Sequence, residues 1–246
     1  MSEVVIEYEK VCKAFGNKVV LNDLDLVVRR GETLAIMGPS GIGKSVTLRH
    51  AVGLLRADRG TVRVEGHDMA TIARQDLVEL RRRIGYLFQE GALINWLSVG
   101  ENVALPLRES TDLSAAEIRA RVEQKLELVQ LRGTSSLMPP ELSGGMRKRV
   151  GLARALVTEP EIVFFDEPNT GLDPEISMSV NHLIRDLKDR LGITAVVVTH
   201  LVSCILVVAD RVVLIDQGRV FAEGTPEEFI RNPNERLQRF LAKPHD

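Results

Sequence analysis

A glycine-rich segment near the start of the chain has the residue types and spacing of a phosphate-binding loop. Residues 38–45 read Gly-Pro-Ser-Gly-Ile-Gly-Lys-Ser and fit the pattern Gly-x-x-x-x-Gly-Lys-Ser/Thr at every fixed position. Glycines in such a loop allow backbone N–H groups to surround a phosphate at the N-terminus of a helix. Lys44 can neutralise β- and γ-phosphate oxygens, and the hydroxyl of Ser45 can ligate Mg²⁺. The segment therefore predicts a site for a nucleoside triphosphate.

An apolar run later in the chain ends in two acids. Residues 162–165 are Ile-Val-Phe-Phe, and Asp166 and Glu167 follow them. Neighbouring side chains of a strand point to opposite faces, so the two carboxylates are expected to have different roles. Asp166 can hold Mg²⁺ through its hydration shell, and Glu167 can polarise an attacking water. Taken alone, an acidic pair after a strand is as often a solvent-exposed surface feature as a functional one. The phosphate loop upstream favours roles in binding a metal ion and positioning water.

A second candidate anion site precedes this acidic strand. Residues 142–146 are Leu-Ser-Gly-Gly-Met, and a basic amphipathic helix is expected to follow over residues 147–156. Ser143 would cap that helix, and the glycines Gly144 and Gly145 would present backbone N–H groups at the positive end of its dipole. The sequence thus predicts two phosphate-binding segments in a single chain.

These segments, in this order, resemble the ATP-binding cassette proteins, the ATPases of ABC transporters. The family sequence Leu-Ser-Gly-Gly-Gln is matched at residues 142–146 except for Met146, and the resemblance covers nearly the whole chain. It implies that Phe15 stacks on adenine, that Gln89 lies at the junction with a helical insert, that Asp173 belongs to a dimer-facing loop, and that His200 contacts the γ-phosphate. Phe15 taken alone is more often a core residue, and an aspartate before a proline is first a helix N-cap, so Asp173 can have both roles.

The resemblance implies ATP and Mg²⁺ as ligands and a full set of site residues. The expected catalytic residues are Glu167, His200 and Lys44, and the expected metal ligands are Ser45, Gln89 and Asp166. The expected nucleotide-binding residues are Phe15, Gly38, Pro39, Ser40, Gly41, Ile42, Gly43, Lys44, Ser45, Val46, Gln89, Ser143, Gly144, Gly145 and Asp173.

The resemblance also implies partners. In this family ATP lies between the phosphate loop of one subunit and the Ser-Gly-Gly loop of the other, so a head-to-tail homodimer is expected beneath separate integral membrane permease subunits. Finer similarities point to the ATPases of Mla-type, Mce-associated lipid transporters, which implies phospholipid as the cargo and an Mce-domain lipid-binding protein as a further partner. These similarities lie in residues 37–44, 87–93, 102–109 and 137–146.

The elements that must position these residues alternate between strands and helices. Strands are expected at residues 33–37, 62–65, 84–88, 162–165, 194–199, 212–215 and 220–221, and a hairpin over 4–28. Helices are expected from Lys44, around residues 75–83, from Asp173 to near Gly192, and from Thr225. Residues 91–142 lack strand signals and contain two capping boxes, Ser98 with Glu101 and Ser114 with Glu117.

This alternation predicts an α/β fold with a mostly parallel sheet flanked by helices. Together with the resemblance, it predicts a P-loop NTPase core with an N-terminal antiparallel β subdomain and a helical insert, as in an ABC nucleotide-binding domain. A single ABC ATPase domain is expected over residues 4–242. Its catalytic core with the β subdomain would take about 4–90 and 157–230, and its helical subdomain about 91–156.

Composition excludes several other classes of protein. The chain has 246 residues, a net charge of −2 and 44% hydrophobic residues, so neither a nucleic-acid binder nor an integral membrane protein is indicated. Residues 195–209 form the longest apolar stretch and are too few to span a bilayer, and no secretory signal is visible. A cytoplasmic protein is expected, with Cys12 and Cys204 as small core residues. The resemblance further implies a peripheral position on the cytoplasmic face of the inner membrane. Residues 232–246 are expected to form a surface helix and a frayed tail.

Alternatives remain at this stage. A non-transport ABC ATPase, such as one for iron–sulphur cluster assembly, or an importer or exporter ATPase for another cargo would share the same motifs. A regulatory subunit that binds ATP without hydrolysing it is disfavoured because Glu167 is present. Asn169 and Leu201 depart from the usual family residues, threonine and an acid, without removing a phosphate or metal ligand.

Overall fold

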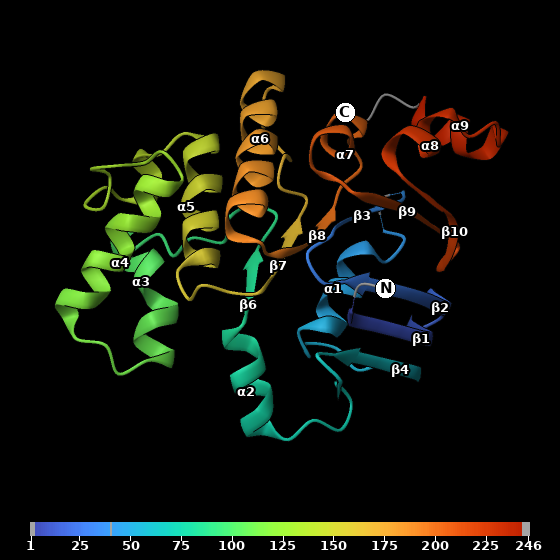
Figure 1. Cartoon of the computed structure of the whole chain (residues 1–246), viewed down its shortest axis with the longest axis horizontal. Helices are drawn as coiled ribbons and strands as arrows, with labels where there is room; N and C mark the ends of the chain where they lie inside the picture. Colours follow the sequence, from blue (N-terminus) through green and yellow to red (C-terminus); the bar gives the residue numbers. More distant parts are fainter. Residues whose placement is uncertain (1–2, 40, 243–246) are drawn as a thin grey trace.

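Two β-sheets with helices around them make up the described part of the chain, residues 3–39 and 41–242, in this computed structural model (Figure 1). The strands are β1 (Val4–Phe15), β2 (Lys18–Arg29), β3 (Thr33–Met37), β4 (Arg59–Val64), β5 (His67–Asp68), β6 (Ile84–Leu87), β7 (Ile162–Asp166), β8 (Thr194–Val198), β9 (Arg211–Asp216) and β10 (Arg219–Gly224). The helices are α1 (Lys44–Ala51), α2 (Arg74–Arg82), α3 (Val99–Ser110), α4 (Ala115–Leu128), α5 (Gly144–Leu156), α6 (Pro174–Leu191), α7 (Val202–Val208), α8 (Pro226–Arg231) and α9 (Glu235–Leu241), with a 3₁₀ turn at Pro139–Glu141.

The smaller sheet is antiparallel and has the strand order β2-β1-β4-β5. Strands β1 and β2 form the predicted hairpin, which closes with Phe15 opposite Lys18 across the turn at Gly16. Strand β4 begins at Arg59, before its predicted start, and pairs with β1. Its place in this sheet confirms an antiparallel unit at the N-terminal end of the chain.

The larger sheet has the order β10-β9-β3-β8-β7-β6 and is parallel except at the edge strand β10. The predicted fold class, an α/β fold with a mostly parallel sheet, is confirmed. In the parallel register Leu87 lies opposite Phe165, and Asp166 and Ile36 lie on either side of Val198. The carboxyl ends of β6, β7, β8 and β3 therefore meet at one edge of the sheet, where ligands of open α/β sheets bind.

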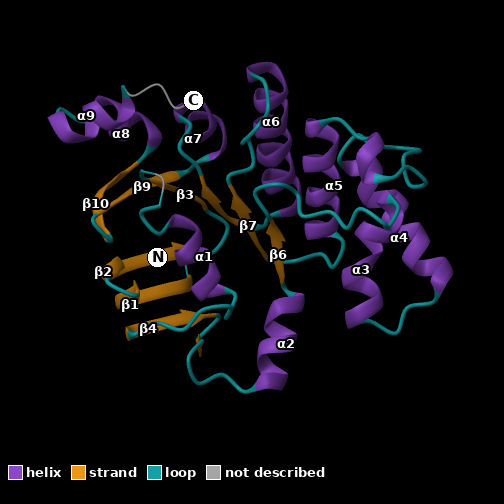
Figure 2. Ribbon diagram, turned by 180° about the vertical axis from the view of Figure 1, so that it is seen from behind, coloured by secondary structure: helices purple, strands orange, loops and turns teal. Residues whose placement is uncertain are grey.

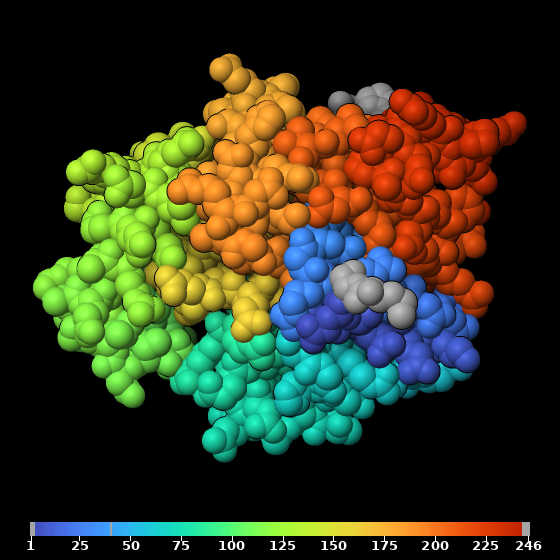
Figure 3. Space-filling view, in the orientation of Figure 1, coloured from blue at the N-terminus to red at the C-terminus, as the bar shows by residue number. Residues whose placement is uncertain are grey.

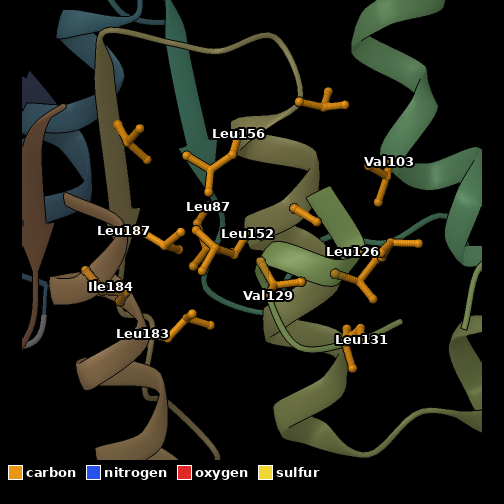
Figure 4. Close-up of a cluster of buried hydrophobic side chains, with 14 of the residues drawn as sticks. Leu87, Val103, Leu126, Val129, Leu131, Leu152, Leu156, Leu183, Ile184 and Leu187 are labelled. Carbon is orange, nitrogen blue, oxygen red and sulfur yellow. The ribbon is translucent and has the colours of Figure 1, made fainter. Parts of the chain in front are cut away.

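Alternating side chains along the central strands divide the core into layers. On β7, Ile162 and Phe164 pack with α1 and the smaller sheet, whereas Val163 and Phe165 pack with α5 and α6. A strand buried on both faces reads as a continuous apolar run, as the sequence of β7 does. Figure 4 shows part of the second cluster, with Leu187 of α6 next to Leu87 of β6 and Leu152 of α5.

The helices α3, α4 and α5 lie together at one end of the molecule, away from the antiparallel sheet (Figure 2). Both predicted capping boxes are present, because the hydroxyls of Ser98 and Ser114 accept from the backbone N–H groups of Glu101 and Glu117. In the space-filling view this green region is separated from the red C-terminal region by residues of α6, drawn in orange (Figure 3). The predicted helical insert is thus confirmed as a group of helices.

Two helices near the C-terminal side add to the expectations. Helix α7 lies in the second half of the apolar stretch 195–209, where only the strand at its start was predicted, because periodicity does not separate a short buried helix from a buried strand. The expected surface helix is present as α9, and it is anchored by Leu237, which is buried in a cluster with Met37 and Phe229. The last part of the expected tail, residues 243–246, lies outside the described residues.

Both cysteines are buried and unbridged, as predicted. Burial raises the pKa of the Cys204 thiol to about 12, so it behaves as a small apolar side chain. Over residues 3–39 and 41–242, none of the helices has the length and apolar character that a bilayer span requires.

Candidate functional site

The phosphate loop leaves β3 at the edge where the parallel strands end. Gly38 follows Met37, and a side chain there would place a Cβ 2.6 Å from the carbonyl oxygen of Ile215, so only glycine fits. Gly43 precedes α1 with φ of 110°, and a Cβ on it would lie 2.7 Å from Val20. Both predicted loop glycines are therefore required by the backbone path. Ser40, a predicted member of the loop, lies outside the described residues.

Lys44 is the buried cation of this loop. Its ammonium donates to the carbonyl oxygens of Gly38 at 2.8 Å and Pro39 at 3.2 Å, and it lies 3.6 Å from the carboxylate of Glu167. Burial lowers the pKa of Lys44, and the negative charges of Glu167 and Asp166 oppose that shift. Ionised phosphate oxygens accept more strongly than carbonyl oxygens, so this ammonium is well placed to bind them.

Asp166 is held from two sides at the end of β7. The hydroxyl of Ser45 donates to Asp166 Oδ1 at 2.7 Å, and the hydroxyl of Tyr86 donates to Asp166 Oδ2 at 3.0 Å. Burial, with Asp166 adding to the effect, raises the pKa of Tyr86, so the phenol remains a proton donor. The structure thus brings together Ser45 and Asp166, which the sequence predicted as metal ligands, and adds an aromatic donor.

Glu167 lies in a left-handed backbone conformation directly after Asp166. Its φ is 50°, which is costly for a residue with a side chain and is typical of functional sites. Its carboxylate oxygen Oε2 lies 2.6 Å from His200 Nδ1. The hydroxyl of Thr170 lies 3.5 Å from the same Oε2 of Glu167. The carbonyl oxygen of Glu167 accepts from the ammonium of Lys148 at 3.4 Å. Glu167 and His200, which were each predicted as catalytic residues, are therefore in direct contact.

A cavity of about 410 Å³ opens beside these groups. Phe15 lies at its side with 47% of its surface exposed, which excludes a core role and leaves an aromatic face available. The cavity is lined by Phe15, Lys18, Val20, Gly41, Gly43, Lys44, Ser45, Val46, Gln89 and Glu167. A larger cavity of about 540 Å³ lies between α3 and α4, but it has none of the predicted site residues in its lining.

The residues of the second predicted anion site, Ser143, Gly144 and Gly145, are not among the described residues that line the 410 Å³ cavity. Ser143 caps α5, where its hydroxyl accepts from the N–H of Met146 at 3.2 Å. Asp173 caps α6, where its carboxylate accepts from the N–H groups of Glu175 and Ile176. Gly144 and Gly145 form the first turn of α5. These residues form a separate group on two helix N-termini.

The oxygen ligands at Ser45 and Asp166 fit Mg²⁺ by their chemistry, since this ion prefers hydroxyl and carboxylate oxygens and retains water and phosphate ligands. Among the described residues there is no group of three or more His, Cys, Asp or Glu side chains arranged to hold a metal. A magnesium ion shared with phosphates needs no such group.

Two departures from the family pattern lie outside the lining of the 410 Å³ cavity. The amide nitrogen of Asn169 donates to Ser177 Oγ at 2.8 Å and Asn181 Oδ1 at 3.0 Å, which ties the loop after Glu167 to α6. Leu201 donates its backbone N–H to Thr199 Oγ1 and packs against the core. Neither lines the 410 Å³ cavity.

The sequence missed Tyr86 and Lys148. An aromatic residue in a short strand looks like a core residue, and only its register opposite Phe164 directs the phenol to Asp166. Lys148 lies in a helix rich in basic residues, where a lysine is usually solvated. Its position at one helical turn from Gly145 is the only sequence signal that it shares a face with the second glycine loop.

Known proteins resemble the chain over most of its length. A family model described as ABC transporter matches residues 21–170. The intermembrane phospholipid transport system ATP-binding protein MlaF of Haemophilus influenzae is 42% identical over 100% of this chain and 93% of its own length. The methionine import ATP-binding protein MetN of Rhizobium johnstonii is 41% identical over 94% of this chain and 64% of its own length.

A solved structure has the same fold. The ATP-binding cassette MJ0796, in a dimeric post-hydrolysis state bound to ADP and Pi, superposes with a TM-score of 0.81 at 31% identity and covers 90% of this chain and 98% of its own. The family match spans residues 21–170, which include the phosphate loop, the acidic strand and the capped glycine loop. The chain belongs to the ATP-binding cassette family and is an ABC transporter ATPase.

Proposed function

We propose that the chain works as a head-to-tail homodimer that binds two ATP molecules and drives transport through separate permease subunits. The observation that carries this proposal is the division of the site. The phosphate-loop cavity contains Lys44, Ser45 and Glu167, whereas Ser143, Gly145 and Asp173 lie on other helix ends outside its lining. A second copy facing the cavity with its own α5 N-terminus would complete each site.

Within one site, the chain's own groups can bind and orient the substrate. The loop from Gly38 to Ser45 and the Lys44 ammonium would bind the β- and γ-phosphates, and the exposed ring of Phe15 would stack on adenine. Glu167 would orient a water molecule toward the γ-phosphorus and accept its proton, so that the bond to the bridging oxygen breaks and ADP and phosphate form. His200, in contact with Oε2 of Glu167, would keep this carboxylate in place and reach the γ-phosphate.

Magnesium is assigned to Ser45 and Asp166, with Gln89 at the edge of the same cavity as a third ligand. The ion would neutralise phosphate charge during transfer. The hydroxyl of Ser45 already points to Asp166 Oδ1, so both ligands face one point.

Motion between open and closed dimers would follow the state of the nucleotide. ATP bridges the two subunits, and its hydrolysis separates the charges that hold them together. The movement would pass to the permease through the region around Gln89 and the helices α3 to α5. We assign the catalytic core with the β subdomain to about residues 4–90 and 157–230 and the helical subdomain to about 91–156.

For the cargo, we propose phospholipid. MlaF is a phospholipid transport protein by name, and similarity to it extends over the full chain. Because MetN is almost as similar, identity alone does not choose between cargoes, and the choice rests on residues 87–93, 102–109 and 137–146, including Met146. The partners would then be a permease and an Mce-domain lipid-binding protein, with this chain on the cytoplasmic face of the inner membrane.

Substitution of Glu167 tests the ATPase dimer. Glu167→Gln is expected to abolish turnover and to give a dimer with ATP and a monomer with ADP in size-exclusion chromatography, because the bridging γ-phosphate persists. Lys44→Ala is expected to show no ATP-dependent dimer. Glu127→Gln is the control, since this acid is exposed on α4. Turnover by Glu167→Gln at the rate of the control would refute the site.

Purification of the tagged chain from its native membranes separates the cargo proposals. Co-purification of a permease, an Mce-domain protein and phospholipid is expected. Recovery of an amino-acid-binding protein instead would overturn the lipid cargo, and recovery of soluble assembly factors alone would overturn transport while leaving the ATPase intact.

A further inference from the structure

A buried lysine of α5 lies behind the catalytic acid. Lys148 is 5% exposed, and its ammonium donates to the carbonyl oxygen of Glu167 at 3.4 Å. Lys44, on the phosphate side, approaches the carboxylate of the same residue. Glu167 is thus flanked by two cations, one toward the phosphates and one toward α5.

The environment of Lys148 is unusual for a buried charge. Within residues 3–39 and 41–242, no carboxylate oxygen lies within the 4.0 Å ion-pair distance of its ammonium. Burial lowers the pKa of Lys148, and the charges of Glu90, Glu167 and Asp166 oppose the shift from farther away. A buried cation without a direct counter-ion destabilises a fold relative to an apolar side chain of similar size. Packing alone therefore does not account for a lysine here.

Lys148 contacts a stretch of backbone, at Glu167, whose conformation is unfavourable and must be held in place. Glu167 is in the left-handed region with φ of 50°, and its N–H donates to the carbonyl oxygen of Val198 at 2.9 Å. Its side chain is held by His200. The ammonium of Lys148 donates a hydrogen bond to the carbonyl oxygen of Glu167. The peptide group after Glu167 is therefore fixed, as is the peptide group before it. Because both planes are held, the backbone cannot rotate about Glu167 as a unit, which would re-aim its Cα–Cβ bond and turn the carboxylate away from the cavity.

Lys148 also connects Glu167 to the second glycine loop. Gly145 and Lys148 are one turn apart and share a face of α5. A Cβ at Gly145 would lie 2.6 Å from Ile176 Cγ2, so the start of α5 is in direct contact with α6. Any shift of the Ser143 to Gly145 turn is therefore transmitted along a short rigid segment to the Glu167 carbonyl.

We propose that Lys148 is a positioning residue that fixes the main chain of Glu167 and so keeps its carboxylate directed at the attacking water. This inference rests on the role proposed for Glu167 in ATP hydrolysis. Lys148 itself contacts neither nucleotide nor water in this scheme.

The test compares Lys148→Met, Lys148→Arg and Lys125→Met in the purified full chain. Lys125 is the matched control, because it is also a lysine exposed by only 5% on a neighbouring helix, paired with Glu159 at 3.1 Å and outside the cavity. Lys148→Met is expected to lower kcat for ATP about 10- to 100-fold with KM within about threefold, as expected for a misplaced catalytic group. Its Tm is expected not to fall, since methionine removes a buried charge.

Rescue distinguishes positioning from simple packing. Lys148→Arg keeps a cationic donor and is expected to recover kcat to within about threefold of the native chain, whereas Lys125→Met is expected to keep native kcat. An unchanged kcat in Lys148→Met would overturn the inference, and so would a fall in kcat accompanied by an equal rise in KM or a matching loss in Lys125→Met. The proposed function fails separately, if Glu167→Gln retains native turnover.

Discussion

At the scale of single residues, the site depends on how Asp166 is oriented. Ser45 and Asp166 were predicted from their motifs, because a hydroxyl after the loop lysine and an acid at the end of an apolar strand are both tied to phosphate chemistry. The contact of Asp166 with Tyr86 was not predicted, because it depends on the register between β6 and β7. Loss of a group that orients a metal ligand commonly lowers metal affinity or activity by about 10- to 100-fold.

Removal of the Tyr86 hydroxyl is expected to weaken the use of Mg²⁺. Tyr86→Phe leaves Asp166 Oδ2 without its 3.0 Å donor, so the Mg²⁺ concentration for half-maximal ATP hydrolysis should rise about tenfold. The other tyrosine is the control: Tyr8 donates to the carbonyl oxygen of Thr47, and Tyr8→Phe should lower stability by about 1 kcal/mol without changing the Mg²⁺ requirement. If both variants needed the same Mg²⁺ concentration for half-maximal ATP hydrolysis, Tyr86 would not orient Asp166 for metal binding.

At the scale of elements, the sequence predicted what local pattern determines. Strands such as β3 and β7 were predicted because they are continuous apolar runs between loops, and α3 and α4 because Ser98 and Ser114 begin capping boxes. Helix α7 and the packing of α9 depend on contacts distant in sequence, so local pattern did not reveal them. The same limit applies to the site: its motifs were evident, but the approach of Lys148 to Glu167 requires α5 to lie beside the end of β7.

The contact between β6 and α5 provides a test of this packing. A Cβ at Gly85 of β6 would lie 2.3 Å from the carbonyl oxygen of Ala155, a backbone atom that cannot move aside alone. Gly85→Ala is expected to lower the free energy of unfolding by about 3 kcal/mol in urea titrations, the upper range for an overpacked core. Gly66→Ala should cost about 1 kcal/mol, since the space there is open and only its positive φ is unfavourable. A smaller loss for Gly85→Ala than for Gly66→Ala would mean that β6 and α5 separate easily.

At the scale of the whole molecule, α1 joins the phosphate loop to the core between the two sheets. Leu48 and Ala51 of α1 belong to the cluster that contains residues of both sheets, and His50 beside them is 1% exposed. The Nδ1–H of His50 donates to the carbonyl oxygen of Val46 at 2.7 Å. The helix that carries Lys44 and Ser45 thus has a titratable side chain buried in the centre of the molecule.

The buried His50 is expected to make stability depend on pH. Burial is the main cause that lowers the pKa of His50 from its ordinary value of 6.5, and the hydrogen bond to Val46 only partly opposes it. Below about pH 6.5, His50 is therefore protonated in the unfolded chain but still neutral in the folded chain. As the pH is lowered, the free energy of unfolding should decrease by at most about 1.4 kcal/mol per pH unit, until His50 is protonated in the folded chain as well.

Unfolding titrations between about pH 7.5 and 5.5 measure this contribution as a slope. His50→Leu should flatten the slope relative to the native chain, whatever its effect on absolute stability. His182→Leu, at an exposed position of α6, should leave the slope as it is. If His182→Leu flattened the slope and His50→Leu did not, the acid sensitivity would originate at the surface. The expected result would instead place it in α1, so that mild acid would loosen the helix that follows the phosphate loop.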